Sequence, residues 1–194
     1  MVLPSEHLGF QPGGETNGLD VLLFGGDPVE GSFHAIGEGL GLCAVRIEDY
    51  FFDRGVARLK SSKYKEAYED FTAAINLKPD LADAYVNRSI TYRYLNKRQE
   101  AYDDLSKALE LEPLNTTALF NRGYMYGQQE MFQESLNQMN AAIKLDPTHE
   151  RALFYRGIAK VNLDDEEGAC EDWKKSVEMG FEDIHGIIEK HCRG

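Results

Sequence analysis

The sequence predicts an all-α protein, a solenoid of four stacked helix pairs that ends in a capping helix and is preceded by a glycine-rich arm. Three prolines recur at intervals of 34 residues: Pro79, Pro113 and Pro147. Four arginines keep the same spacing: Arg54, Arg88, Arg122 and Arg156. A fixed period of this length is typical of arrays in which each unit packs on its neighbours. The repeats therefore extend over residues 48–183.

The arm, residues 1–47, is expected to have partly β or irregular structure. It holds 10 of the 18 glycines, which disfavours a helix. Residues 21–24 and 32–36 are short apolar runs closed by glycine, a pattern typical of two strands or a hairpin. Because an isolated hairpin is marginal in water, the arm is expected to dock on the helices, with pairing to another chain or mobility as alternatives. Homo-oligomer formation through the arm, or occupation of a groove by residues 21–24, therefore stays open.

Each unit is expected to hold two helices separated by a short polar turn, giving units 48–81, 82–115, 116–149 and 150–183. On the first helix of the first unit, small or apolar residues are spaced by four: Phe51, Gly55 and Leu59. On the second helix the spacing is three or four: Tyr64, Ala67, Phe71 and Ala74. Each helix therefore has one apolar face. Pro79 then ends the second helix, since the residue before proline avoids the α conformation.

Equivalent positions of the four units predict how the helices pack. Small residues are expected to let the helices of each pair approach closely: Gly55, Ser89, Gly123 and Gly157, then Ala67, Ala101, Ser135 and Ala169. Large residues at another equivalent position are expected in the core: Phe71, Leu105, Met139 and Trp173. The recurring arginines lie beside acidic residues of the second helices, such as Asp70, Asp104 and Asp172, which predicts ion pairs between helices.

A unit with a small residue, alanine, a large apolar residue, alanine and proline at these offsets resembles the tetratricopeptide repeat (TPR). The resemblance covers residues 48–183, and the last unit is similar to the final repeat of small bacterial TPR proteins. The fourth unit departs from the family by carrying Phe181 where proline is expected. Gly180 is expected to end that helix instead, and residues 184–194 then form a capping helix and tail.

The resemblance implies that the first helices of the units line a concave groove that binds a peptide or a partner helix. Carried over position by position, it assigns these residues to the groove: Phe52, Val56, Val86, Asn87, Ile90, Phe120, Asn121, Tyr124, Phe154, Tyr155 and Ile158. The groove positions also include charged residues: Asp49, Asp53, Asp83, Arg93 and Arg151.

One strip of the groove, Phe52, Val86, Phe120 and Phe154, is expected to be an exposed apolar patch, because the other face of each first helix already serves the core. Asn87 and Asn121 are expected to pair with the ligand backbone. Ordinary packing between repeats is the alternative for the strip. Some TPR proteins clamp the terminal carboxylates of chaperones with lysine, asparagine and arginine; only Asn87 matches that set, so a chaperone-tail receptor is not expected.

The composition disfavours several other functions. A net charge of −12 argues against nucleic-acid or anionic-membrane partners, which are bound mainly through lysine and arginine. No apolar run is long enough for a membrane-spanning helix, and no basic leader is visible. Cys43, Cys170 and Cys192 form no C-x-x-C pair, so we expect unpaired thiols, no disulfide framework and a reducing, cytoplasmic location.

Signals for catalysis are weak. Four residues near the end of the chain, His185, Glu189, His191 and Cys192, have a spacing that matches no closed zinc site. The glycine-rich arm has no phosphate-binding motif. We therefore expect no cofactor, no metal and no enzyme activity, and interpret the chain as a protein interaction scaffold. The alternative is that the arm belongs to a β module with its own activity, with the repeats as an assembly handle.

Overall fold

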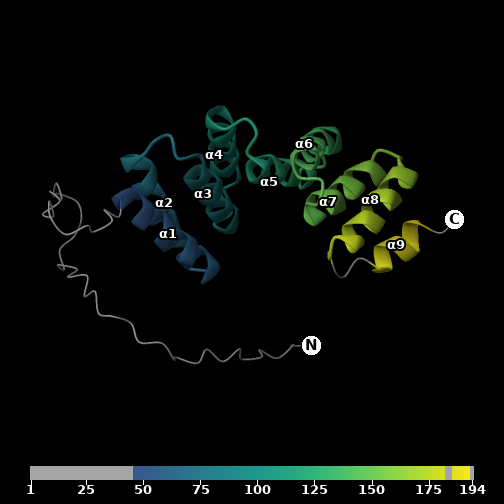
Figure 1. Cartoon of the computed structure of the whole chain (residues 1–194), viewed down its shortest axis with the longest axis horizontal. Helices are drawn as coiled ribbons and strands as arrows, with labels where there is room; N and C mark the ends of the chain where they lie inside the picture. Colours follow the sequence, from purple (N-terminus) through teal and green to yellow (C-terminus); the bar gives the residue numbers. More distant parts are fainter. Residues whose placement is uncertain (1–45, 182–184, 193–194) are drawn as a thin grey trace, which may run out of the picture. The chain divides into compact units, whose positions relative to one another are not determined.

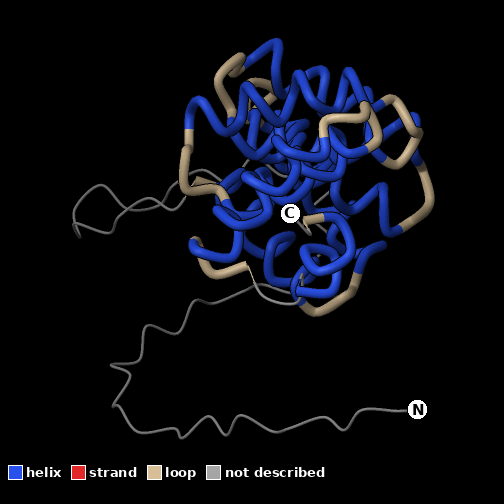
Figure 2. Tube along the Cα trace, turned by 90° about the vertical axis from the view of Figure 1, so that its right-hand side faces the viewer, coloured by secondary structure: helices blue, strands red, loops and turns tan. Residues whose placement is uncertain are grey.

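The structure, a computed structural model, describes residues 46–181 and 185–192, which lie in one compact unit, Ala44–Gly194. These residues form helices and no strand (Figure 2). The helices come in pairs along the chain (Figure 1): α1 (Ile47–Lys60) and α2 (Tyr64–Leu77), α3 (Ala82–Tyr94) and α4 (Arg98–Leu111), α5 (Thr116–Gly127) and α6 (Phe132–Leu145), α7 (Glu150–Val161) and α8 (Glu166–Glu178), then α9 (His185–His191).

The predicted all-α solenoid of helix pairs is confirmed for the described residues. The two helices of each pair pack on each other, each second helix packs on the helix that follows it in the chain, and the first helices α1, α3, α5 and α7 contact their neighbours in that order. The expectations for the arm, namely strands at residues 21–24 and 32–36, docking and chain pairing, concern residues outside the described part.

Each first helix ends in the same way. The residue that reverses the chain has a positive φ in all four pairs: Ser62 (58°), Asn96 (59°), Glu130 (59°) and Asp164 (63°). The amide of the following residue donates to a carbonyl five residues earlier, as Lys97 does to Tyr92 over 2.8 Å. These bonds satisfy carbonyls at the helix end. Gly180, with a φ of 97°, ends α8 as predicted.

The helices of a pair approach closely where the sequence predicts it. A Cβ atom at Gly55 would lie 2.7 Å from the Phe71 ring, and one at Gly157 would overlap the indole of Trp173. The residues predicted for the core are buried: Phe71, Leu105, Met139 and Trp173. Trp173 Nε1 also donates to the carbonyl of Phe154 over 3.1 Å, so the indole nitrogen is satisfied inside the core.

Arginine–aspartate pairs join the helices in three of the four repeats. Arg88 donates to both carboxylate oxygens of Asp104 at 2.7 and 2.8 Å. Arg54 likewise donates to both carboxylate oxygens of Asp70, and Arg156 to both of Asp172. The third repeat differs from the expected ion pair, because position 138 is a glutamine. Arg122 donates to Gln138 Oε1 at 2.9 and 3.2 Å and keeps the contact without a charge partner.

The C-terminal helix closes the apolar end of the array, as expected of a capping helix. Phe181, Ile187 and Ile188 pack on the cluster that contains Phe154 and Trp173. This surface of the last repeat is therefore covered by the chain itself.

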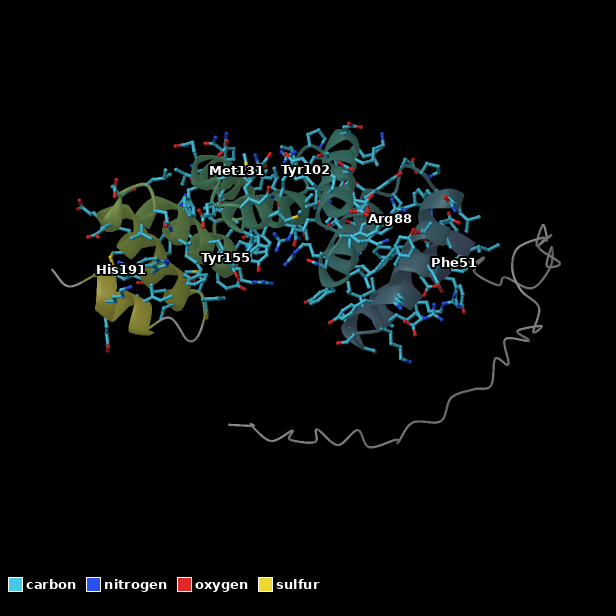
Figure 3. All side chains as sticks on the ribbon, turned by 180° about the vertical axis from the view of Figure 1, so that it is seen from behind. Phe51, Arg88, Tyr102, Met131, Tyr155 and His191 are labelled. Carbon is cyan, nitrogen blue, oxygen red and sulfur yellow. A yellow bond between two sulfur atoms is a disulfide. The ribbon has the colours of Figure 1, made fainter. Side chains whose placement is uncertain are left out.

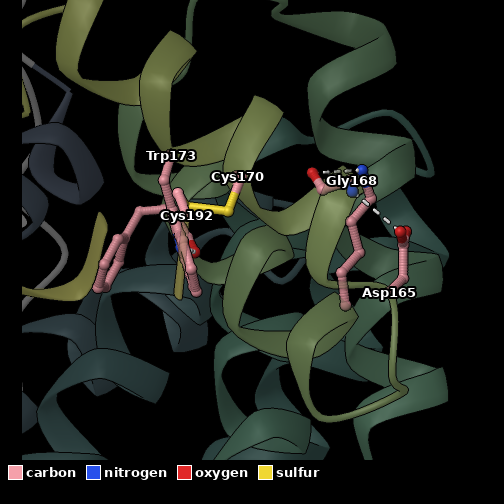
Figure 4. The surroundings of a disulfide bond; sticks show 7 residues. Asp165, Gly168, Cys170, Trp173 and Cys192 are labelled. Atoms are coloured by element: carbon pink, nitrogen blue, oxygen red, sulfur yellow. Dashed lines mark hydrogen bonds between the residues drawn. A yellow bond between two sulfur atoms is a disulfide. The ribbon is translucent and has the colours of Figure 1, made fainter. Parts of the chain in front are cut away.

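The structure corrects the expectation of unpaired thiols. Cys170 on α8 and Cys192, directly after α9, form a disulfide with a Cα–Cα distance of 5.6 Å (Figure 4). The sequence shows no pairing motif because the two residues meet only when α9 folds back on α8. Disulfides persist mainly in oxidising environments, so the argument for a reducing, cytoplasmic location no longer holds. Cys43 lies outside the described residues.

We expect Asp104→Ala to lower the free energy of unfolding by about 3 kcal/mol, because it leaves the Arg88 guanidinium partly buried without its carboxylate. Asp104→Gln reproduces the neutral pairing of Arg122 with Gln138 and should cost only about 1 kcal/mol. Denaturant unfolding of both variants measures the difference. Equal losses would contradict this expectation, because they would show that hydrogen bonds to a neutral glutamine recover none of the stability that the charge pair provides.

Reduction of the disulfide should destabilise the C-terminal end of the array. The bond closes a loop across a sequence separation of 22, which corresponds to about 3 kcal/mol in the chain-entropy account. We expect reductant to lower the melting temperature of the intact chain. A Cys170→Ser, Cys192→Ser variant should melt at that lower temperature with or without reductant, and a further shift in the variant would trace the effect to something other than this bond.

Candidate functional site

The first helices carry all the residues assigned to the groove, but the structure divides them into two groups. Some keep part of their side chain exposed: Phe52, Val56, Asn87, Ile90, Tyr124, Tyr155 and Ile158. The others are buried: Val86, Phe120, Asn121 and Phe154. The partly exposed residues come from all four first helices, so they remain a candidate surface for a ligand.

The expected exposed apolar strip is wrong at three of its four residues. Val86 is 1% exposed, Phe120 5% and Phe154 9%. Val86 and Phe120 belong to the central core cluster, and Phe154 stacks on Phe181 with ring centroids 4.8 Å apart. These side chains fill the space between neighbouring repeats, which was the alternative explanation for the strip. Phe52 is the one member that stays partly exposed.

The two asparagines are engaged within the array. Asn87 Nδ2 donates to the carbonyl of Asp83 over 2.8 Å, and Asn121 Nδ2 donates to the carbonyl of Thr117 over the same distance. Asn121 is 5% exposed, and its Oδ1 accepts a bond from Arg93 Nη1 at 3.2 Å. Asn121 therefore orients Arg93, whereas pairing of Asn87 with a ligand backbone stays a prediction.

Phe120 and Tyr124 on α5 and Tyr155 on α7 form an aromatic cluster within the candidate surface. Figure 3 labels Tyr155. The ring centroids of Tyr124 and Tyr155 are 4.9 Å apart in an edge-on arrangement, and those of Phe120 and Tyr155 are 5.9 Å apart. Phe120 is the buried member, and the two tyrosines reach the surface.

Two arginines lie on different rings of this cluster. Arg93 of α3 places its guanidinium carbon 4.4 Å from the ring centroid of Tyr124. Arg151 of α7 places its own 5.1 Å from that of Phe120. These distances are typical of cation–π contacts. Both arginines occupy groove positions, but neither was among the residues predicted to bind a ligand. The sequence did distinguish them, because they lie outside the 34-residue spacing of the arginines that pair with aspartate.

Tyr155 has a hydroxyl that keeps its proton. Burial raises its pKa, and the neighbouring Tyr124 hydroxyl adds to the increase, while the charges of Arg151 and Arg93 and a hydrogen bond with Arg151 oppose it. The phenol is therefore a neutral hydrogen-bond donor at physiological pH. Arg93 and Arg151 contact the Tyr124 and Phe120 rings, and both rings contact Tyr155, so the two arginines lie in one region of the surface.

Tyr124 separates two recesses. One has a volume of about 170 Å³ and is lined by polar and apolar groups together, among them Arg93, Arg98 and Met125. The other, of about 60 Å³, is lined mostly by apolar groups, among them Tyr155 and Ile158. A recess that contains two arginines and a mainly apolar recess thus share Tyr124 as a wall. This arrangement suits a chain of alternating side-chain character better than a single small molecule.

The described residues offer no other centre of chemistry. Within residues 46–181 and 185–192, no group of three or more histidine, cysteine, aspartate or glutamate side chains is placed to hold a metal ion. Cys192, one of the four residues considered for zinc, forms the disulfide instead. In the same ranges, no helix has the length and apolar character needed to cross a membrane.

Comparison with known proteins agrees with the geometry. The tetratricopeptide repeat family model matches residues 82–113 and 116–149. A comparison with curated proteins finds no match. Among solved structures, pilF of Pseudomonas aeruginosa is 21% identical with a TM-score of 0.64, and the match covers 69% of this chain and 61% of pilF.

Two further similar structures are of proteins associated with peptides. YrrB, described as a TPR protein with an unusual peptide-binding site, is 23% identical over 74% of each chain, with a TM-score of 0.60. The first TPR of Spaghetti (RPAP3), bound to the HSP90 peptide SRMEEVD, is 22% identical with a TM-score of 0.58, covering 60% of this chain and 93% of that one. At these identities the similarity shows the fold.

Proposed function

Because the chain is a protein of several tandem tetratricopeptide repeats, we propose that it is a non-catalytic scaffold that binds a peptide or a partner helix along α1, α3, α5 and α7. The observation that carries the proposal is the pair of recesses around Tyr124, next to partly exposed Tyr155 and Ile158. Stacked repeats present extended surfaces of this kind to their partners.

The exposed aromatic residues are suited to anchor a partner. Tyr124 and Tyr155 hold each other edge-on, and Phe120 supports them from the core, so little rotamer freedom remains to be lost on binding. Pre-ordered tyrosines in the centre of a surface are typical of residues that dominate binding energy. The contribution of the buried Val86, Phe120 and Phe154 is then indirect, through support of this surface.

The relatives add an analogy. YrrB is described as having a peptide-binding site, and the first TPR of RPAP3 as binding an HSP90 peptide. Binding of a peptide by the present chain extends that use of the fold, and the choice of partner depends on its own side chains. An activity of the arm is not favoured by any observation on the described residues.

The proposal predicts that Tyr155→Ala combined with Ile158→Ala reduces capture of protein partners by the intact chain at least about tenfold, the loss expected when a pre-ordered anchor is truncated. Affinity capture followed by quantitative mass spectrometry measures it. Leu77→Ala with Leu114→Ala is a matched control, because both leucines are more than half exposed, at 52% and 73%, and neither belongs to a first helix.

Circular dichroism must show the same helix content in both double variants. If the control loses partners as strongly as the Tyr155, Ile158 variant, or if that variant captures as much as the original chain, binding does not take place on the proposed surface.

A further inference from the structure

Arg93 and Arg151 differ from the arginines that build the repeats. Arg54, Arg88 and Arg156 each hold a buried aspartate of a second helix at 2.5 to 2.7 Å. Among the described residues, no carboxylate lies within ion-pair distance of Arg93 or Arg151. Both guanidinium groups are nevertheless positioned, one by the Tyr124 ring and Asn121, the other by the Phe120 ring.

A guanidinium that rests on an aromatic ring keeps its edge available for hydrogen bonds. Arg93 uses one nitrogen, Nη1, for Asn121, and its side chain lines the recess of about 170 Å³. Arginine binds planar carboxylates through two parallel donors, and such charge-assisted bonds are about twice as strong as neutral ones. The ligand group that best fits this site is therefore a carboxylate.

We propose that this surface selects an extended peptide segment in which acidic side chains pair with Arg93 and Arg151 and an apolar side chain enters the recess lined by Tyr124, Tyr155 and Ile158. The inference rests on the proposed function, because it places the peptide on α3, α5 and α7. Since Tyr124 lines both recesses, the acidic and the apolar side chain belong to nearby residues of the peptide.

The overall charge of the chain makes this selectivity informative. At a net charge of −12, acidic peptides are repelled at long range. At physiological ionic strength that repulsion is screened beyond roughly 8 Å, whereas contacts with the two arginines act at hydrogen-bond distance. A preference for acidic segments must therefore arise locally, and it must disappear when the two charges are removed.

A random library of short synthetic peptides, acetylated and amidated so that only side chains carry charge, tests the inference on the immobilised full chain. Sequencing of the bound fraction should show enrichment of aspartate and glutamate near leucine, isoleucine or phenylalanine. Arg93→Gln with Arg151→Gln should lower the acidic enrichment about tenfold, the loss expected for a charge-assisted pair. Arg93→Lys, which keeps the charge, should retain more of the enrichment than Arg93→Gln.

Lys65→Gln is the control for net charge, because Lys65 is an exposed residue of α2, a second helix. It should leave the enrichment unchanged. An acidic enrichment that survives in the double arginine variant, or its absence from the original chain, overturns the inference. Enrichment of apolar residues alone, lost in the Tyr155→Ala, Ile158→Ala variant, would overturn the acidic selectivity while leaving the proposed function intact. Enrichment of neither class would overturn both.

Discussion

The close approach of the two helices in each pair is the constraint on which the rest of the structure depends. At Gly55 and Gly157 the backbone of the first helix lies against the ring of a large residue on the second, with no space for a side chain between them. This contact buries one face of each first helix. The next repeat buries a second face, through residues such as Val86 and Phe120. Only a narrow strip of each first helix is left for a ligand.

Periodic features could be predicted from the sequence because every repeat makes the same helix contacts through equivalent positions. The helix pairs, the small residues at the crossings, the buried Phe71 and Trp173, and the pairing of Arg88 with Asp104 all follow from the 34-residue period. The Cys170–Cys192 disulfide and the substitution of an amide for an acid at Gln138 occur once each. A repeat period does not predict features that occur in one repeat only, so these two features were found from the structure.

The candidate site was only partly predictable for the same kind of reason. The position of a residue in the repeat predicts whether it lies on the groove side of a first helix. Its burial depends on how much of that side the next repeat covers. Phe120 and Tyr124 are four residues apart on α5, yet one is covered by the following repeat and the other reaches solvent. The positions of Arg93 and Arg151 on neighbouring aromatic rings required the packing of three different helices, which no single repeat encodes.

The Cys170–Cys192 disulfide links the last two described helices covalently, so the two ends of the described array differ. In a structure held by nearest-neighbour contacts, local opening begins at terminal elements, which have a partner on one side only. α9 is tied to α8 by the disulfide, while α1 among the described helices packs mainly on α2 and has no comparable tie. The disulfide should thus limit local opening at the α8 end of the described array, next to α7, which carries part of the aromatic cluster.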